Sequence, residues 1–191
     1  MTATDEEDQI LTYSLSGTDS SSIGINSSSG IMTFNSAPDY ETKSSYSVTV
    51  AISDGTNSTT QNITVNVVNL NDNSPSITSS ATFSAAENQT SIGAVTATDA
   101  DGDTLTYSLS GTDASSMSIN SGSGVLTFNS APDYETKTSY TATVTASDGT
   151  NSATQNITVN VTNVSDIAPV FTSGSTFSAN ENQTAIGTVT A

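Results

Sequence analysis

Apolar residues alternate with serine, threonine and asparagine through most of the chain, and the alternation has a period of two. This pattern is typical of half-buried strands, and no segment has the 3.6-residue period of an amphipathic helix. Strands are expected at residues 77–83, 92–97, 105–109, 125–128, 140–146 and 157–161. Turn-forming residues separate them at 101–103, 121–124 and 148–151. The pattern therefore predicts an all-β protein.

The pattern recurs with a period of 94 residues. Residues 3–97 and 97–191 are identical at 66 of 95 positions, with no gap. One such period fits a small domain, and about seven short strands per period favour tandem seven-stranded Greek-key β-sandwiches. Pro75 and Pro169 follow segments rich in Asn and Asp that we interpret as junctions. The predicted parts are an incomplete repeat at 1–73 that lacks its first two strands, a complete repeat at 74–167, and the first two strands of a third at 168–191.

The composition limits the function. There are 19 acidic residues against two lysines, and the net charge is -17, so the chain should repel nucleic acid and anionic membrane surfaces and should suit cations. It has no Cys and no His, which excludes disulfides and nucleophilic sites of the Ser–His or Cys–His type, and we expect no enzyme. No apolar run approaches the ~20 residues that span a bilayer, so we expect no membrane insertion and place any export signal or anchor outside the chain.

Fourteen of the 19 acids belong to short motifs that recur once per repeat. The motifs are Glu87-Asn88, Asp99-Ala100-Asp101, Pro132-Asp133-Tyr134-Glu135, Ser147-Asp148-Gly149, and the junction acids Asp72 and Asp166. Carboxylates gathered at strand ends repel each other unless a hard cation lies between them. Calcium takes six to eight oxygen ligands of this kind, so the motifs predict calcium binding.

The order of these motifs resembles the cadherin repeat, and the resemblance covers nearly the whole chain. It is closest to the Ser/Thr-rich cadherin-like arrays of large bacterial surface proteins. The resemblance implies cadherin/Ig-like sandwiches, an extracellular or cell-surface location, and calcium at each junction. At the first junction it implies the ligands Asp39, Glu41, Asn69, Asn71, Asp72, the carbonyl of Asn73, Asp99, Asp101 and Asp148. At the second it implies Glu87, Asp133, Glu135, Asn163 and Asp166.

Further positions match the same motifs, and some depart from them. The corresponding ligands at the two ends of the chain are Asp5, Glu7 and Asp54 in the first repeat and Glu181 in the third. Asn69 and Asn163 stand where the family usually has Asp. Because Ser165 and Ile167 replace Asn71 and Asn73, we expect fewer or weaker ions at the second junction.

A junction without metal is expected to act as a hinge, and calcium that bridges two repeats should make it stiff. The sequence therefore predicts a calcium-stiffened array that serves adhesion or forms a filament or stalk on a bacterial surface. Its expected partners are neighbouring repeats, other copies of itself, and a cell-surface protein or glycan. One alternative is a fibre subunit that assembles head to tail by strand complementation. The competing interpretation of the chain ends is that the chain is a segment of a longer array. Another alternative is a carbohydrate-binding module. Such modules usually present exposed aromatic rings to the sugar, and Tyr40 and Tyr134 are the aromatic residues that we do not assign to the core.

Overall fold

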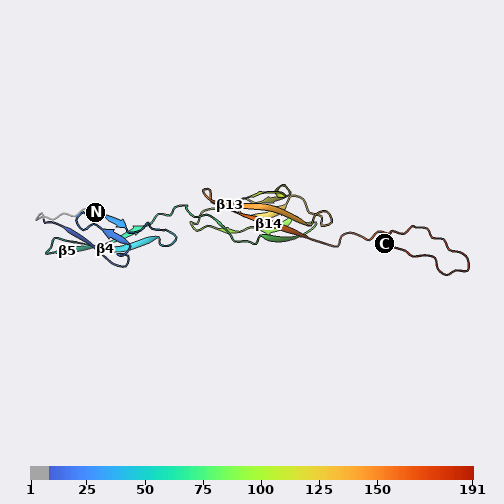
Figure 1. Cartoon of the computed structure of the whole chain (residues 1–191), viewed down its shortest axis with the longest axis horizontal. Coiled ribbons are helices and arrows are strands. Elements are labelled where there is room, and N and C mark those ends of the chain that lie inside the picture. Colours follow the sequence, from blue (N-terminus) through green and yellow to red (C-terminus); the bar gives the residue numbers. More distant parts are fainter. Residues whose placement is uncertain (1–8) are drawn as a thin grey trace.

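The computed structural model describes residues 9–191, and their regular structure is almost entirely β. The first repeat, the second repeat and residues 168–191 follow one another along a single long axis (Figure 1). Within the described residues, helix is limited to one 3-10 turn, Ala114–Ser116. No helix in residues 9–191 has the length and apolar character that a membrane span requires.

The second repeat forms two facing sheets and a short ribbon. One sheet has the order β10-β13-β14-β7, the other has the order β11-β12-β8, and β6 pairs with β9. The strands are β6 (Ser76–Ile77), β7 (Thr82–Ala86), β8 (Ser91–Ala94), β9 (Ala97–Thr98), β10 (Thr106–Ser110), β11 (Met117–Ile119), β12 (Val125–Phe128), β13 (Ser139–Ser147) and β14 (Ser152–Thr162). The pairing of β7 with β14 is parallel, whereas the other pairings are antiparallel. The predicted all-β sandwich is confirmed, and strand β11 is one that the apolar pattern did not locate.

Alternation along the strands builds the core of the second repeat. Val95, Leu126, Val144 and Val159 are 0% exposed and lie between the two sheets. Gly124 precedes β12 with a φ of +68°, and a Cβ at this position would lie 2.1 Å from the carbonyl oxygen of Val95. The residue before β12 is therefore glycine, because the backbone of Val95, between β8 and β9, passes too close for any side chain.

The first repeat has the same arrangement with fewer strands. Its sheets have the orders β1-β4-β5 and β2-β3. The strands are β1 (Thr12–Ser16), β2 (Ile23–Ile25), β3 (Met32–Phe34), β4 (Ser45–Ser53) and β5 (Ser58–Asn66). Within residues 9–73 no strand corresponds to β7 or β8. Each of the two sheets in that range therefore has one strand fewer than its counterpart in the second repeat.

Residues 168–191, here named the C-terminal arm, run outward and return, so that the chain end lies close to the start of the arm (Figure 1). The expected pair of strands is not assigned there, since a strand needs a partner and the arm contacts no other sheet edge in one chain. The amide of Thr172 nevertheless donates to the carbonyl of Thr190 at 2.9 Å. Thr78 and Thr96, 94 residues earlier, make the same hydrogen bond at 2.8 Å.

The two lysines of the chain hold corresponding positions in the two repeats. Lys137 pairs with Asp113 and lies 4.6 Å from the centre of the Tyr140 ring, and the other carboxylate oxygen of Asp113 accepts the amide of Thr141 at 2.8 Å. Lys43 pairs with Asp19 in the same way. Lys137 and the Thr141 amide together lower the pKa of Asp113 below its usual value. This recurring pair ties two loops of the sandwich together and was not assigned a role from the sequence.

We predict that Asp113→Asn lowers the stability of the second repeat by about 1 kcal/mol at pH 7 in chelator. The folded pKa of Asp113 lies below the ordinary value of 3.8, so its contribution is present above that pH and is lost as the pH falls through the lowered pKa. Urea unfolding between pH 3 and pH 7 checks this, and the variant should show a flatter acid dependence than the parent. Identical pH profiles for the two chains would show that the pair contributes nothing.

Candidate metal centre at the repeat junction

Two loops of the second repeat, the connecting segment and one loop of the first repeat meet at the junction. Asp99 and Asp101 directly follow β9, and Asp148 begins the turn between β13 and β14. Residues 69–73 connect the two repeats, and Glu41 belongs to the loop between β3 and β4 of the first. Loops at the ends of several strands thus bring oxygen-bearing side chains together at the junction.

Asp101 organises the connecting segment. Its Oδ2 accepts the amides of Asp72 at 3.2 Å and Asn73 at 2.9 Å, and its Oδ1 accepts the side-chain amide of Asn73 at 2.9 Å. Asn69 donates to the backbone carbonyl of Asp101 at 2.8 Å. The side-chain amide of Asn73 and its neighbours hold the pKa of Asp101 below its usual range, so this carboxylate is ionised at neutral pH.

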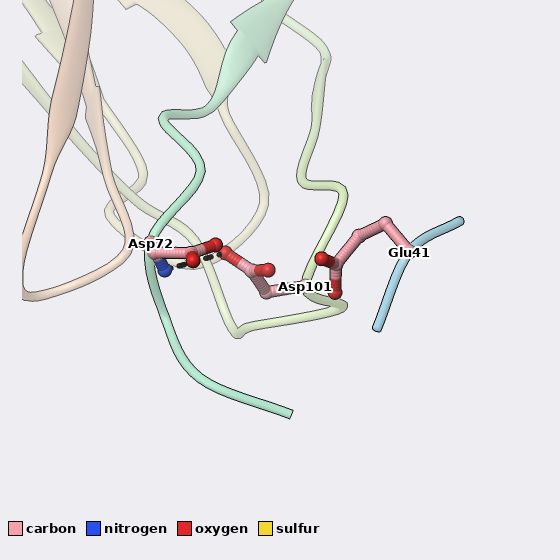
Figure 2. A group of neighbouring side chains, drawn as sticks. All are labelled: Glu41, Asp72 and Asp101. Atoms are coloured by element: carbon pink, nitrogen blue, oxygen red, sulfur yellow. Dashed lines mark hydrogen bonds between the residues drawn. The ribbon is translucent and has the colours of Figure 1, made fainter. Parts of the chain in front are cut away.

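Glu41, Asp72 and Asp101 each bring a carboxylate oxygen to within 4.8 Å of the others. Figure 2 shows the Asp101 carboxylate between those of Asp72 and Glu41, which come from three separate segments of the chain. Desolvation and the nearby carboxylate of Asp101 raise the pKa of Glu41. In the absence of a cation, like charges from two repeats therefore repel each other across the junction.

A second group of acids lies in the same loop. Oxygens of Asp99, Asp101 and Asp103 also lie within 4.8 Å of one another. Asp99 Oδ1 accepts the amides of Asp101 at 3.0 Å and of Asp103 at 3.3 Å. Desolvation and the charges of Asp99, Asp101 and Asp148 raise the pKa of Asp103. The sequence prediction left Asp103 out, although the alternating acids at 99, 101 and 103 were a signal for it.

Two buried carboxylate oxygens beside these groups have no partner. Asp99 Oδ2 and Asp148 Oδ2 are inaccessible to solvent and make no hydrogen bond. The other oxygen of Asp148 accepts the amides of Thr150 and Asn151 at 2.7 and 2.6 Å. Desolvation raises the pKa of Asp148, but these hydrogen bonds outweigh that effect, so the pKa lies below its usual value. A buried ionised oxygen without a hydrogen bond is costly, and a cation is the partner that fits it.

The remaining predicted ligands of the first junction fall into two groups. Asn71 Oδ1 and the carbonyl of Asn73 both face the side-chain amide of Asn151, at 3.1 and 3.3 Å, so they lie beside the Asp148 turn. Asn151 is another participant that the sequence did not reveal. Asp39 instead accepts the amides of Glu41 and Thr42 at 3.0 and 3.2 Å, which shapes its own loop, and it is outside the three-carboxylate group.

At the second junction Glu87, Glu135 and Asp166 form a similar three-carboxylate group. Glu87 is 3% exposed, and its two oxygens accept the amides of Tyr134 at 2.8 Å and Val164 at 2.7 Å. Asn163 donates to Glu135 at 3.1 Å. Within residues 9–191 this group has no acids of a following repeat beside it.

The other predicted ligands are more distant from either group. Asp133 accepts the amide of Glu135 at 2.9 Å and the hydroxyl of Thr136 at 2.9 Å, as Asp39 does in its loop. Asp54 accepts the amides of Thr56 and Asn57 in the turn between β4 and β5. Glu181 is exposed in the C-terminal arm. Asp5 and Glu7 lie outside the described residues.

The oxygens gathered at the first junction fit a hard divalent cation better than any other group. They are carboxylates, amide oxygens and a backbone carbonyl, which is the ligand set of calcium. Two of these oxygens are buried and accept no hydrogen bond, so they are available to coordinate an ion. A chain without His or Cys offers neither nitrogen nor sulfur ligands of the kind that favour zinc.

Comparisons with known proteins agree with this arrangement. Residues 80–162 match the cadherin domain family. Human protocadherin Fat 4 is 35% identical over 148 residues, which are 72% of this chain and 3% of that protein. The Drosophila melanogaster protocadherin-like wing polarity protein stan is 33% identical over 194 residues, 91% of this chain and 5% of its own length. The chain therefore spans a very small part of these relatives.

Solved structures show the same fold. Mouse cadherin-23 EC22-24 superposes with a TM-score of 0.72 at 25% identity, over 81% of this chain and 53% of that one. Protocadherin gammaB7 EC3-6, solved as a cis-dimer, superposes with a TM-score of 0.75 at 31% identity, over 88% and 44% of the two chains. Cadherin homologues are extracellular adhesion proteins and not enzymes, and cadherin domains in general bind calcium at inter-domain junctions. The chain is thus cadherin-like, and its residues 80–162 are a cadherin domain.

Proposed function

We propose that this chain is part of an extracellular adhesion or spacer array in which calcium stiffens the junction between repeats. The observation that carries the proposal is the pair of buried, unpartnered oxygens of Asp99 and Asp148, which lie beside a carboxylate group drawn from both repeats. Calcium would be held by Glu41 from the first repeat, by Asp72 in the connecting segment, and by Asp99, Asp101, Asp103 and Asp148 from the second. Asn71 and the carbonyl of Asn73 complete this set.

The mechanism needs only charge and geometry. Without a cation, Glu41 is repelled by Asp72 and Asp101. No attractive interaction in this group then favours one orientation of the first repeat relative to the second. A divalent ion reverses this, since each carboxylate is then attracted to the centre of the group. Because Glu41 is the residue that brings the first repeat into this group, its binding to the ion would restrict the angle between the two repeats.

The wider biological role follows from the family. The relatives that match are extracellular adhesion proteins, and one solved neighbour forms a cis-dimer, so contact with a second copy or another cell-surface protein is the partner class that we favour. The bacterial source expected from the resemblance stays a prediction, because the relatives named above come from animals. Of the two aromatic candidates for sugar binding, Tyr134 packs against the hydrophobic core and Tyr40 is exposed, and one exposed ring gives this alternative little support.

Removal of calcium should lower the melting temperature of the chain. Calcium at 100 times its dissociation constant stabilises the folded state by about 2.7 kcal/mol, which is roughly 10 °C or more for a domain of this size. Asp101→Asn should abolish most of this shift, because it weakens one anionic ligand of both groups at the first junction. As a control, Asp113→Asn should lower the melting temperature equally with calcium and with chelator. Equal melting temperatures of the parent chain with calcium and with chelator would refute the ligand assignment.

Glu41→Gln should uncouple the two repeats without unfolding either. We expect the calcium-dependent gain in rigidity to need about ten times more calcium, since one charged ligand is lost. Glu135→Gln, the matched change 94 residues later, alters the second junction and should leave this gain unchanged. Small-angle X-ray scattering or NMR relaxation anisotropy measures the coupling over a calcium titration. If both variants behave alike, Glu41 does not bridge the repeats.

A further inference from the structure

Asn151 reaches from the Asp148 turn to the segment that connects the two repeats. Its side-chain amide donates to Asn71 Oδ1 at 3.1 Å and to the backbone carbonyl of Asn73 at 3.3 Å. Both acceptors are oxygens that would coordinate calcium, whereas Asn151 itself is not among the proposed ligands. Its partners lie 80 and 78 residues earlier in the chain, so the contact joins two separate parts of the junction.

The contact with Asn73 determines which end of the Asn151 side chain faces the connecting segment. A backbone carbonyl only accepts hydrogen bonds, so its partner at 3.3 Å is the amide nitrogen of Asn151 and not the amide oxygen. An amide nitrogen donates hydrogen bonds, whereas calcium takes oxygen ligands. Asn151 therefore holds the oxygens of two other residues through an atom that is not a calcium ligand.

The two acceptor oxygens can bind an ion and accept a hydrogen bond at the same time. Each has two lone pairs, so Asn71 Oδ1 and the Asn73 carbonyl both keep one for a cation. The hydrogen bonds from Asn151 restrict the positions of these oxygens before an ion binds. Because groups that are already ordered lose less entropy on binding, this restriction raises the affinity for calcium.

The turn that carries Asn151 is itself held by hydrogen bonds. Asp148 Oδ1 accepts the backbone amide of Asn151 at 2.6 Å, and the hydroxyl of Ser147 donates to the backbone carbonyl of Asn151 at 2.9 Å. Asp148 Oδ2, the other oxygen of that carboxylate, is buried and makes no hydrogen bond. Asn151 thus brings the oxygens of Asn71 and Asn73 to the turn that carries this unpartnered oxygen.

The counterpart of Asn151 in the first repeat is Asn57, which ends the same kind of turn. Its backbone amide donates to Asp54 Oδ1 at 2.6 Å, as that of Asn151 does to Asp148. Its side-chain amide donates to Asp54 Oδ2 at 3.3 Å, and so stays within its own turn. The two asparagines therefore support their turns alike, and Asn151 in addition holds the connecting segment, so Asn57 is a matched control.

We propose that Asn151 is a positioning residue of the junction, which docks residues 71–73 against the Asp148 turn and so orders the oxygens of Asn71 and Asn73 before calcium binds. The effect on calcium affinity rests on the proposed function. The docking does not, since these hydrogen bonds involve protein atoms alone. Asp101 accepts separate hydrogen bonds from the amides of Asp72 and Asn73, so loss of the Asn151 side chain should loosen the segment without releasing it.

Calcium titration calorimetry of the full chain tests this role, with Asn151→Ala beside the matched variant Asn57→Ala. Asn151→Ala should weaken calcium binding at the first junction about tenfold, since two hydrogen bonds to the ligands are lost. Asn57→Ala should bind calcium like the parent chain. In chelator the two variants should have similar melting temperatures, because each loses one asparagine from the same kind of turn. An unchanged calcium affinity of Asn151→Ala, or a much lower melting temperature of that variant in chelator, would overturn the proposal.

Hydrogen exchange in chelator tests the docking without calcium. The backbone amides of Asp72 and Asn73 are hydrogen-bonded in the docked segment, and they should exchange about tenfold faster in Asn151→Ala. In Asn57→Ala their exchange should match the parent. Equal exchange in all three chains would show that Asn151 does not hold the segment. If the parent chain gave no heat with calcium, the proposed function would fail alone, and the exchange rates would still decide the docking.

Two aspartate variants separate positioning from direct binding. Asn151→Asp offers an oxygen to an ion but no longer donates to Asn71 and Asn73. Thr150→Asp adds the same charge at the preceding, exposed position and keeps the amide of Asn151. We expect Asn151→Asp to bind calcium more weakly than Thr150→Asp does. Equal or tighter binding by Asn151→Asp would show that residue 151 acts as a ligand, which contradicts a positioning role.

Discussion

Electrostatic repulsion between carboxylates at the repeat junction is the constraint on which the rest of this structure depends. Asp101 holds the connecting segment through the amides of Asp72 and Asn73, and this hydrogen bonding forces a carboxylate into a place where Glu41 and Asp103 already carry charge. Desolvation first, and then the neighbouring carboxylates, raise the pKa of Glu41 and of Asp103. The interior of each sandwich carries no such repulsion, because its core is apolar. The one lysine of each repeat pairs with an aspartate of the same repeat. In the proposed function, a divalent cation at the junction would change how the repeats are connected and would leave their internal packing unaltered.

The fold was largely predictable because strands follow a period that can be counted. Alternating Tyr140, Ala142, Val144 and Ala146 predict one face of β13, and the 94-residue period predicts two sandwiches with one plan. Strand β11 was missed because three residues are too few to show alternation. The C-terminal arm was expected to contain strands, and it contains none in a single chain, because strand formation depends on a partner edge that sequence alone does not position. The boundaries assigned to the repeats stay a prediction.

The site was predictable in its residue types and less so in its grouping. Asp99 and Asp101, which follow β9, lie at the junction together with Glu41 from the other repeat, and their role as ligands stays a prediction. Asp39 accepts hydrogen bonds from its own loop, which the motif did not indicate, and its role as a ligand stays a prediction. Asn151 was missed because its contacts with Asn71 and Asn73 join separate loops, whereas Asp103 lies in the same loop as Asp99 and was indicated by the alternating acids. Asp19 and Asp113 were passed over even though they recur at the same offset as the lysines that they bind.

The central claim is that the junction binds calcium through the buried oxygens of Asp99 and Asp148. Isothermal titration of calcium into the chelator-treated full chain tests this most directly, with Asp99→Asn as the paired variant. The account predicts saturable binding of at least one ion per chain, and a large loss of affinity in the variant. Heats no greater than dilution for the parent chain, or an unchanged affinity in the variant, would contradict it.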